Sequence, residues 1–120
     1  MTSALDPSAR LFKIHDRVVW ETATDVVPWA AVDLEDGFVH LSTAHQVKET
    51  ARRHFAERDD LVLIEILQEH LPPDTLRWEA SRGGDLFPHV YGDIPIDAVR
   101  RTAGFSMRAG ATFPNRLLAP

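Results

Sequence analysis

Apolar and polar residues alternate in several short segments of the chain, and this period of two predicts β-strands. The alternating segments cover residues 11–15, 38–42, 76–79 and 87–92. A further segment, residues 61–67, is almost continuously apolar, which predicts a central strand covered on both faces. Glu65 interrupts this segment, so we expect its side chain either near the sheet edge or facing a cleft. Residues 103–109 are expected to form a last edge strand.

A helix is predicted for residues 44–57, because apolar residues recur there at fourfold spacing and form one stripe. These residues are Val47, Ala51 and Phe55. Thr43 precedes Gln46 by three residues, which fits a capping box at the start of this helix. A shorter helix is expected over residues 16–23, and residues 27–34 are expected to be an irregular connection.

Residues 37–43 carry polar side chains that point to a binding site. Alternation along a strand puts His40 and Ser42 on one face, together with Phe38. The segment leads directly into the predicted helix, whose first N–H groups are unpaired and favour an anion. The alternative is purely structural: His40 is a buried, hydrogen-bonded side chain, while Ser42 and Thr43 only cap the helix.

Composition narrows the classes of protein. The chain has 120 residues, of which 44% are hydrophobic, and this suits one domain, assigned to residues 10–120 after a flexible tail at residues 1–9. The net charge of −5 argues against nucleic acid as a partner, although a locally basic cleft leaves that alternative open. The absence of cysteine excludes disulfides and thiolate zinc sites. Without a membrane-length apolar run or a signal-peptide pattern, we expect a soluble cytoplasmic protein with no membrane partner.

The predicted strands bring pairs of polar side chains to their faces. These pairs are Lys13 with His15, His40 with Ser42, Arg77 with Glu79, and His89 with Tyr91. A cleft where such faces meet suits general acid–base catalysis, because imidazole titrates near neutrality and a carboxylate can orient it. Lys13 and His15 either meet an anionic ligand or lie on a half-exposed edge strand. Two histidines and a glutamate are also metal-ligand types, but zinc-protease spacing is missing and no metal is expected. The Gly-x-Ser-x-Gly motif of serine hydrolases is absent.

Four motifs in a fixed order resemble a known bacterial family. They are DGFVHLST at residues 36–43, DLVLI at 60–64, RWE at 77–79 and FPHVYG at 87–92. From about residue 11 to residue 99 the chain resembles the family known as domain of unknown function (DUF) 952. This resemblance implies a small single α+β domain of the ADP-ribosylation fold, with a mixed or antiparallel split sheet and two main helices. ADP-ribosyltransferases share that fold with RNA 2′-phosphotransferases, which use NAD.

The resemblance implies binding roles for residues of the first two predicted strands, residues 11–15 and 38–42. Lys13 or His15 would meet the dinucleotide from the first strand, where the superfamily carries an arginine or histidine. His40, Ser42 and Thr43 correspond to the motif of the second strand, and His40 and Ser42 would orient the nicotinamide ribose. NAD is therefore the expected cofactor, and a small-molecule nucleotide is the expected partner.

The later motifs supply the remaining candidates. Glu79 would polarise a ribose or acceptor hydroxyl, and Arg77, like Lys13, would hold pyrophosphate. His89 and Tyr91 belong to the family's own motif. Together with His40, Glu79 and His89 form the predicted catalytic set of an NAD-dependent ADP-ribosyl- or 2′-phosphotransferase. Two alternatives stay open: a non-catalytic module that binds a nucleotide or another anion, and a small hydrolase that uses His40 and His89.

Overall fold

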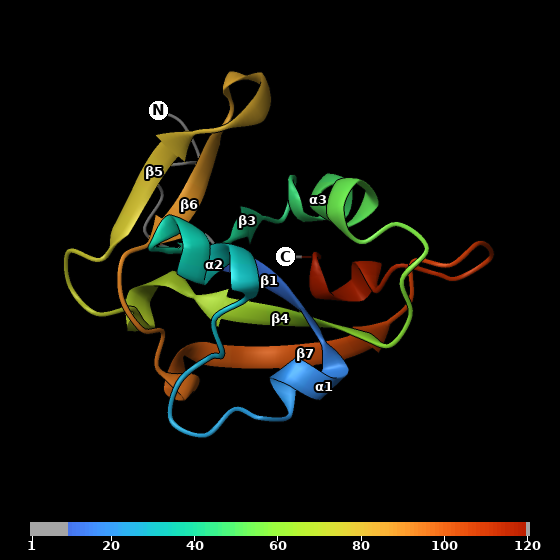
Figure 1. Ribbon diagram of the computed structural model, residues 1–120, viewed down its shortest axis with the longest axis horizontal. Coiled ribbons are helices and arrows are strands. Elements are labelled where there is room, and N and C mark those ends of the chain that lie inside the picture. Colours follow the sequence, from blue (N-terminus) through green and yellow to red (C-terminus); the bar gives the residue numbers. More distant parts are fainter. Residues whose placement is uncertain (1–9, 120) are drawn as a thin grey trace.

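The computed structural model describes residues 10–119, in which seven strands form two antiparallel sheets with short helices around them (Figure 1). The larger sheet has the order β3-β1-β4-β7 and the smaller sheet the order β2-β6-β5. The strands are β1 Arg10–Asp16, β2 Val39–His40, β3 Ser42–Thr43, β4 Leu61–Leu67, β5 Leu76–Ala80, β6 Leu86–Val90 and β7 Val99–Phe105. The helices are α1 Arg17–Trp20, α2 Ala31–Asp36 and α3 Val47–His54, with 3₁₀ turns η2 Gln68–His70, η3 Arg82–Gly84, η4 Ile96–Ala98 and η5 Asn115–Leu117. The predicted small α+β domain with antiparallel sheets is confirmed, while the tail predicted at residues 1–9 lies outside the described residues.

Strand β4 is the centre of the packing, as its apolar sequence predicted. It pairs with β1 on one side and with β7 on the other. Its alternating side chains enter two clusters of buried residues. Leu61 and Leu63 pack with the residues of α3 and the C-terminal segment, whereas Val62, Ile64 and Ile66 pack toward the smaller sheet. Both faces of β4 are therefore covered, which explains why its sequence does not alternate.

Glu65 lies inside this central strand, and both expectations for it are wrong. Its side chain is fully buried and accepts hydrogen bonds from Arg10 at 3.0 Å and Arg101 at 2.8 Å. Arg10 also donates to the carbonyl oxygens of Leu117 and Leu118, so the cluster ties the C-terminal segment to the larger sheet. The guanidinium groups compensate the burial of the carboxylate, which is why a charge is tolerated there.

Helix α3 has the predicted buried face but is shorter than predicted. Val47 and Ala51 are buried, and Phe55 packs against the same cluster just beyond the last helical turn. The side chain of Gln46 accepts a hydrogen bond from the backbone N–H of Thr43 at 3.0 Å, which is one half of the predicted capping box. This contact closes a turn before the helix, so residues 44–46 are not helical.

Residues 37–43 do not form one strand, which corrects the prediction for this segment. The chain leaves the smaller sheet after His40, which pairs with His89, and enters the larger sheet at Ser42, which pairs with Phe12. The crossing at Leu41 interrupts the strand, so His40 and Ser42 belong to different sheets. The Ser42 hydroxyl lies 3.0 Å from the hydroxyl of Thr50 on α3.

Three further expectations need correction. Residues 31–36 form helix α2, where an irregular connection was predicted. The helix predicted over residues 16–23 is only four residues long. Strand β7 is the expected last edge strand, but it begins at Val99 because it pairs along almost the whole of β4.

In the part of the chain that the structure describes, no helix has the length and apolar character needed to cross a membrane.

Candidate functional site

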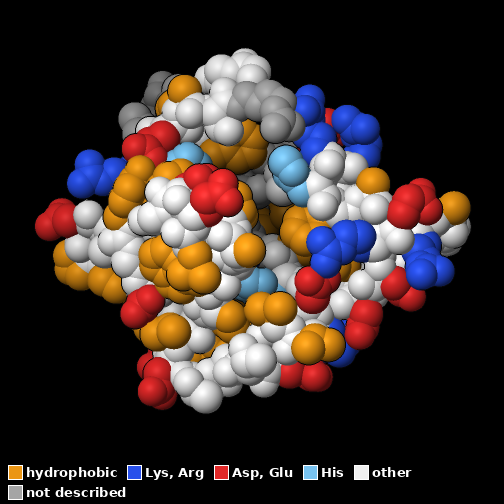
Figure 2. Space-filling model, in the orientation of Figure 1, with side chains coloured by type: hydrophobic (Ala, Val, Ile, Leu, Met, Phe, Trp, Pro, Cys, Tyr) orange, Lys and Arg blue, Asp and Glu red, His pale blue; other side chains and the backbone are white. Residues whose placement is uncertain are grey.

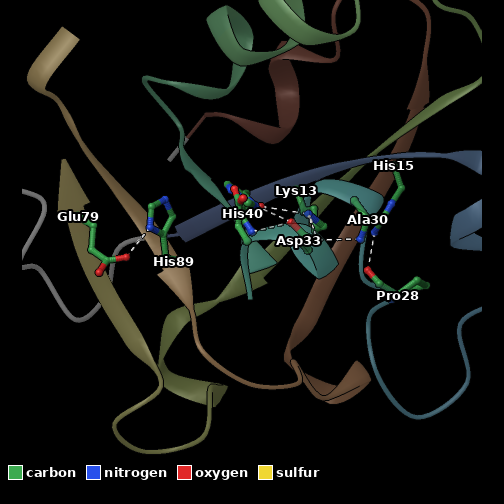
Figure 3. A network of polar contacts seen from close by, with 9 residues as sticks. Lys13, His15, Pro28, Ala30, Asp33, His40, Glu79 and His89 are labelled. Carbon is green, nitrogen blue, oxygen red and sulfur yellow. Dashed lines mark hydrogen bonds and ion pairs between the residues drawn. The ribbon is translucent and has the colours of Figure 1, made fainter. Parts of the chain in front are cut away.

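Asp33, on helix α2, is the centre of a buried polar network (Figure 3). Its carboxylate accepts hydrogen bonds from Nζ of Lys13 at 2.8 Å and from Nδ1 of His40 at 2.7 Å. It also accepts from the backbone N–H groups of Ala30 at 2.8 Å and His40 at 3.0 Å. Burial alone would raise the pKa of Asp33, but the hydrogen bonds from His40 and the charge of Lys13 outweigh it and hold the pKa far below its usual range.

Lys13 reaches this network from strand β1. Its side chain is only 4% exposed, and Nζ also donates to the carbonyl oxygen of His40 at 3.1 Å. Burial lowers the pKa of Lys13, and the carboxylate of Asp33 opposes that effect. Because β1 is an inner strand, the half-exposed edge considered for Lys13 is wrong. The ammonium group is already neutralised, so it does not present a free cation to a ligand.

His40 is held at both ring nitrogens. Nδ1 lies 2.7 Å from Oδ1 of Asp33, and Nε2 lies 2.9 Å from Oδ2 of Asp36. Asp33 and Asp36 are three residues apart on α2, so both carboxylates project from one side of the helix. Helix α2 ends at Gly37, whose φ of +87° is the left-handed conformation of a C-cap, and this turn returns the chain so that β2 begins beside the helix.

His89 lies opposite His40 in the smaller sheet. The two residues are paired across β2 and β6, and their ring centroids are 5.4 Å apart. Nδ1 of His89 lies 2.7 Å from Oε1 of Glu79, and the same oxygen accepts a hydrogen bond from the Tyr91 hydroxyl at 2.8 Å. These two hydrogen bonds lower the pKa of Glu79, and the carboxylate in turn raises the pKa of Tyr91. The ring of Phe38 stacks on His89, with centroids 4.1 Å apart.

A cleft of about 900 Å³ opens over these residues. Figure 2 shows this face of the molecule hollowed near its centre, with histidine side chains around the hollow. The apolar part of the wall includes Phe12, Trp29, Val32 and Phe87. The polar part includes Lys13, His15, His40, Ser42, His45, Thr50, Arg53, His54, Arg58 and His89. A cleft of this size with apolar walls and a few convergent polar groups is typical of small-molecule sites.

The cationic side chains that line the cleft differ in how firmly their charges are paired. The pairs are Lys13 with Asp33, Arg53 with Glu49, and Arg58 with Asp16. The pair of Lys13 is buried, whereas both side chains of the other two pairs are more than 40% exposed. Exposed ion pairs are worth only about 0–1 kcal/mol. An anionic ligand can therefore displace the carboxylates at Arg53 and Arg58 much more readily than the one at Lys13.

The cleft brings together only some of the predicted site residues. Lys13, His15, His40, Ser42 and His89 all line it. Two of them are poorly placed to bind a ligand: the charge of Lys13 is neutralised by Asp33, and the Ser42 hydroxyl turns toward Thr50 on α3.

The other predicted residues lie outside the lining. The Glu79 carboxylate binds Nδ1 of His89 and the Tyr91 hydroxyl, and the Arg77 guanidinium lies over the Tyr91 ring at 5.3 Å. Thr43 uses its backbone N–H to bind Gln46. Glu79 therefore acts on the cleft through His89, and neither Arg77 nor Thr43 is placed to contact a ligand in it.

The ring orientation of His15, which the sequence left open, is fixed by a backbone carbonyl group. Its Nε2 lies 2.7 Å from the carbonyl oxygen of Pro28. Burial lowers the pKa of His15, and the charge of Lys13 lowers it further. In the neutral ring Nε2 must carry the hydrogen that it donates to Pro28, so Nδ1 is a hydrogen-bond acceptor.

Asp33 and Asp36 are the residues of the candidate site that sequence reasoning missed. The available signal was the spacing of two aspartates one helical turn apart, directly before a glycine that can end a helix. A helix of six residues is too short to show a clear apolar period, so the sequence pattern predicted an irregular connection in place of α2.

Among residues 10–119, no group of three or more histidine, aspartate or glutamate side chains is arranged to hold a metal ion.

The fold and the site define a small α+β domain with a histidine-lined cleft. Carboxylates fix the imidazoles of His40 and His89, and we call the part of the cleft formed by these two residues its floor. Residues 13–102 match the family described as "Protein of unknown function (DUF952)", and the chain belongs to this family. The family resemblance carried by the four sequence motifs is thereby confirmed.

Solved structures of one bacterial protein agree with this assignment. The crystal structure of protein CC0527 from Caulobacter crescentus is 38% identical, with a TM-score of 0.83, and the match covers 91% of this chain and 97% of that chain. A double mutant of CC0527 gives 37% identity and a TM-score of 0.82 over the same shares of both chains. The solution NMR structure of CC0527 gives 38% identity and a TM-score of 0.71, covering 85% of this chain and 90% of that chain. No curated protein matches the chain significantly.

Proposed function

We propose that the cleft binds a nucleotide, with NAD as the expected one, and that the protein is an ADP-ribosyl- or RNA 2′-phosphotransferase-like enzyme of the ADP-ribosylation fold. The observation that carries this proposal is a cleft of nucleotide size, about 900 Å³, whose floor holds two histidines fixed by carboxylates. Such a floor suits acid–base chemistry at a ribose or an acceptor hydroxyl. The order of the four motifs supports the link to this superfamily.

The charges of the cleft suggest how a nucleotide lies in it. The buried pair of Lys13 and Asp33 leaves no free cation at the floor, so the sugar and base fit there better than the phosphates. Arg53 and Arg58 also line the cleft and have exposed, weakly held partners. We therefore assign the pyrophosphate to these two arginines, in place of the sequence-based assignment to Lys13 or Arg77.

Binding can be tested by thermal unfolding of the full chain with NAD and with ADP-ribose. A ligand at about 100 times its Kd stabilises the native state by about 2.7 kcal/mol, which raises Tm measurably. Arg53→Ala should weaken this stabilisation. Arg52→Ala is the matched control, because Arg52 binds the same Glu49 but does not line the cleft. Equal losses in both variants, or no stabilisation of the wild type, would contradict the proposed placement.

Turnover separates an enzyme from a binding module. Release of nicotinamide from NAD, measured with and without protein and 2′-phosphorylated RNA acceptors, is the expected activity. His89→Ala should abolish it while NAD still raises Tm. Stabilisation by NAD without nicotinamide release in the wild type would favour the non-catalytic module.

A second candidate is a small hydrolase, which the 5.4 Å distance between the two imidazoles favours. This activity would cleave a nucleotide phosphodiester or ester without consuming NAD. A screen of such substrates, with His89→Ala as the inactive reference, distinguishes it from transfer.

A further inference from the structure

The two histidines at the floor of the cleft use their ring nitrogens differently. Nδ1 of His89 is bound to Glu79, but Nε2 has no hydrogen-bond partner among the described residues. Figure 3 shows Glu79 joined to one nitrogen of His89 while the other nitrogen points away from it. Because His89 lines the cleft, Nε2 is the nitrogen that a ligand can reach.

The proton on the His89 ring can be located from its partners. Oε1 of Glu79 accepts hydrogen bonds from both the Tyr91 hydroxyl and Nδ1 of His89, and these bonds lower the pKa of Glu79. Glu79 is therefore a carboxylate at neutral pH, and a carboxylate only accepts hydrogen bonds. Nδ1 of His89 must carry a hydrogen, so in the neutral ring the lone pair lies on Nε2.

The hydrogen-bond partners of His40 favour a ring with a hydrogen on both nitrogens, unlike the ring of His89. Both of its nitrogens face carboxylate oxygens, at 2.7 Å for Asp33 and 2.9 Å for Asp36. If either nitrogen were bare, its lone pair would point at an anionic oxygen. Lys13 from β1 and His89 from β6 are the other titratable groups that face this residue. One lysine and an imidazolium balance the two carboxylates, whereas a neutral His40 would leave the cluster negative.

We propose that Nε2 of His89 is the proton-accepting nitrogen of this cleft and that His40 is a fixed imidazolium which takes no part in proton transfer. The ring states belong to the free protein, and only their use in a transfer reaction rests on the proposed function. In that use, Nε2 takes the proton of an acceptor hydroxyl. The acceptor oxygen bonds to the ribose C1′ of NAD while the bond from C1′ to the nicotinamide nitrogen breaks and leaves its electron pair on nicotinamide. Nε2 then passes its proton to water, so the transfer releases nicotinamide and a proton.

Nitrogen-15 NMR of the histidine-labelled full chain tests the ring states without any ligand. Once its ring is neutral, His89 should show the widely separated nitrogen signals of a ring protonated at Nδ1. His40 should show the two close signals of an imidazolium. His40→Gln and His89→Gln assign the signals. A bare nitrogen on His40, or a hydrogen on Nε2 of His89, would overturn the proposal.

Asp36→Asn is a second variant that does not depend on removing a histidine. Asp36 is exposed and does not line the cleft, so the fold should persist. The variant should shift the His40 signals toward those of a neutral ring and leave the His89 signals unchanged; unchanged His40 signals would count against a role for the second carboxylate in fixing the imidazolium.

The outcomes also separate this proposal from the proposed function. The expected ring states in a protein that neither binds NAD nor releases nicotinamide would remove the function and leave the assignment of the nitrogens intact. Nicotinamide release that survives in His89→Gln would refute the role of Nε2, even in a confirmed transferase.

Discussion

Replacing Asp33 by asparagine tests whether the buried network at the cleft floor holds the fold together. The substitution keeps the size of the side chain and removes its charge. Lys13, only 4% exposed, would then be a buried ammonium without a counter-ion. Removing one partner of a buried ion pair costs about 3–5 kcal/mol. Since a domain of this kind is stable by about 5–15 kcal/mol in total, Asp33→Asn should lose a large part of its stability.

Urea unfolding at neutral pH, followed by tryptophan fluorescence, measures this loss as a lower midpoint at unchanged slope. Asp36→Asn is the matched control, because Asp36 binds the same His40 from an exposed position and should cost about 0–1 kcal/mol. Combining Asp33→Asn with Lys13→Met removes both charges, so the double variant should be more stable than the sum of the single losses predicts. Equal costs for Asp33→Asn and Asp36→Asn, or strict additivity with Lys13→Met, would refute the reasoning.

Three other predictions concern stability. Gly37→Ala should cost about 1–2 kcal/mol in urea unfolding, because the φ of +87° at this C-cap is a left-handed conformation that a Cβ disfavours. Glu65→Gln should cost roughly 1.5–3 kcal/mol, since it removes the charge that Arg10 and Arg101 bind, and limited proteolysis should then release the C-terminal segment more readily. The folded-state pKa of both Asp33 and Glu65 is depressed, so their contribution is present above the unfolded values near about pH 4 and is lost as the pH falls further. Acid titration of unfolding should be shallower below about pH 4 in Asp33→Asn than in the wild type, and equal slopes would show that Asp33 is not the titrating group.

The sequence predicts the parts of this fold in which a period extends over enough residues. Strand β4 could be predicted because seven residues carry its pattern, and the buried face of α3 because its apolar stripe covers two turns. Helix α2 and the division of residues 37–43 could not, because elements of two to six residues carry too little pattern. Their conformation is decided by partners distant in the chain, namely His89 for His40 and Phe12 for Ser42.

The candidate site shows the same division. Alternation identified His40 and His89 as polar groups on strand faces, and the structure places both in one cleft. Alternation also placed Ser42 on the same strand as His40, whereas the chain changes sheets between them, although both residues line the cleft. Asp33 escaped notice because its importance lies in the residues that it meets, and nothing in its immediate neighbours along the chain indicates a buried lysine or histidine.

The position of the Asp33 network explains why site and fold are difficult to separate in this domain. Lys13 belongs to the larger sheet, His40 to the smaller sheet, and Asp33 on α2 binds both. The network thus joins the two sheets at the point where the chain crosses between them. A change at Lys13, Asp33 or His40 will therefore alter stability together with any ligand effect. His89 is different, because its Nε2 contributes no hydrogen bond among the described residues, and substitutions there test function with the least disturbance of this joint.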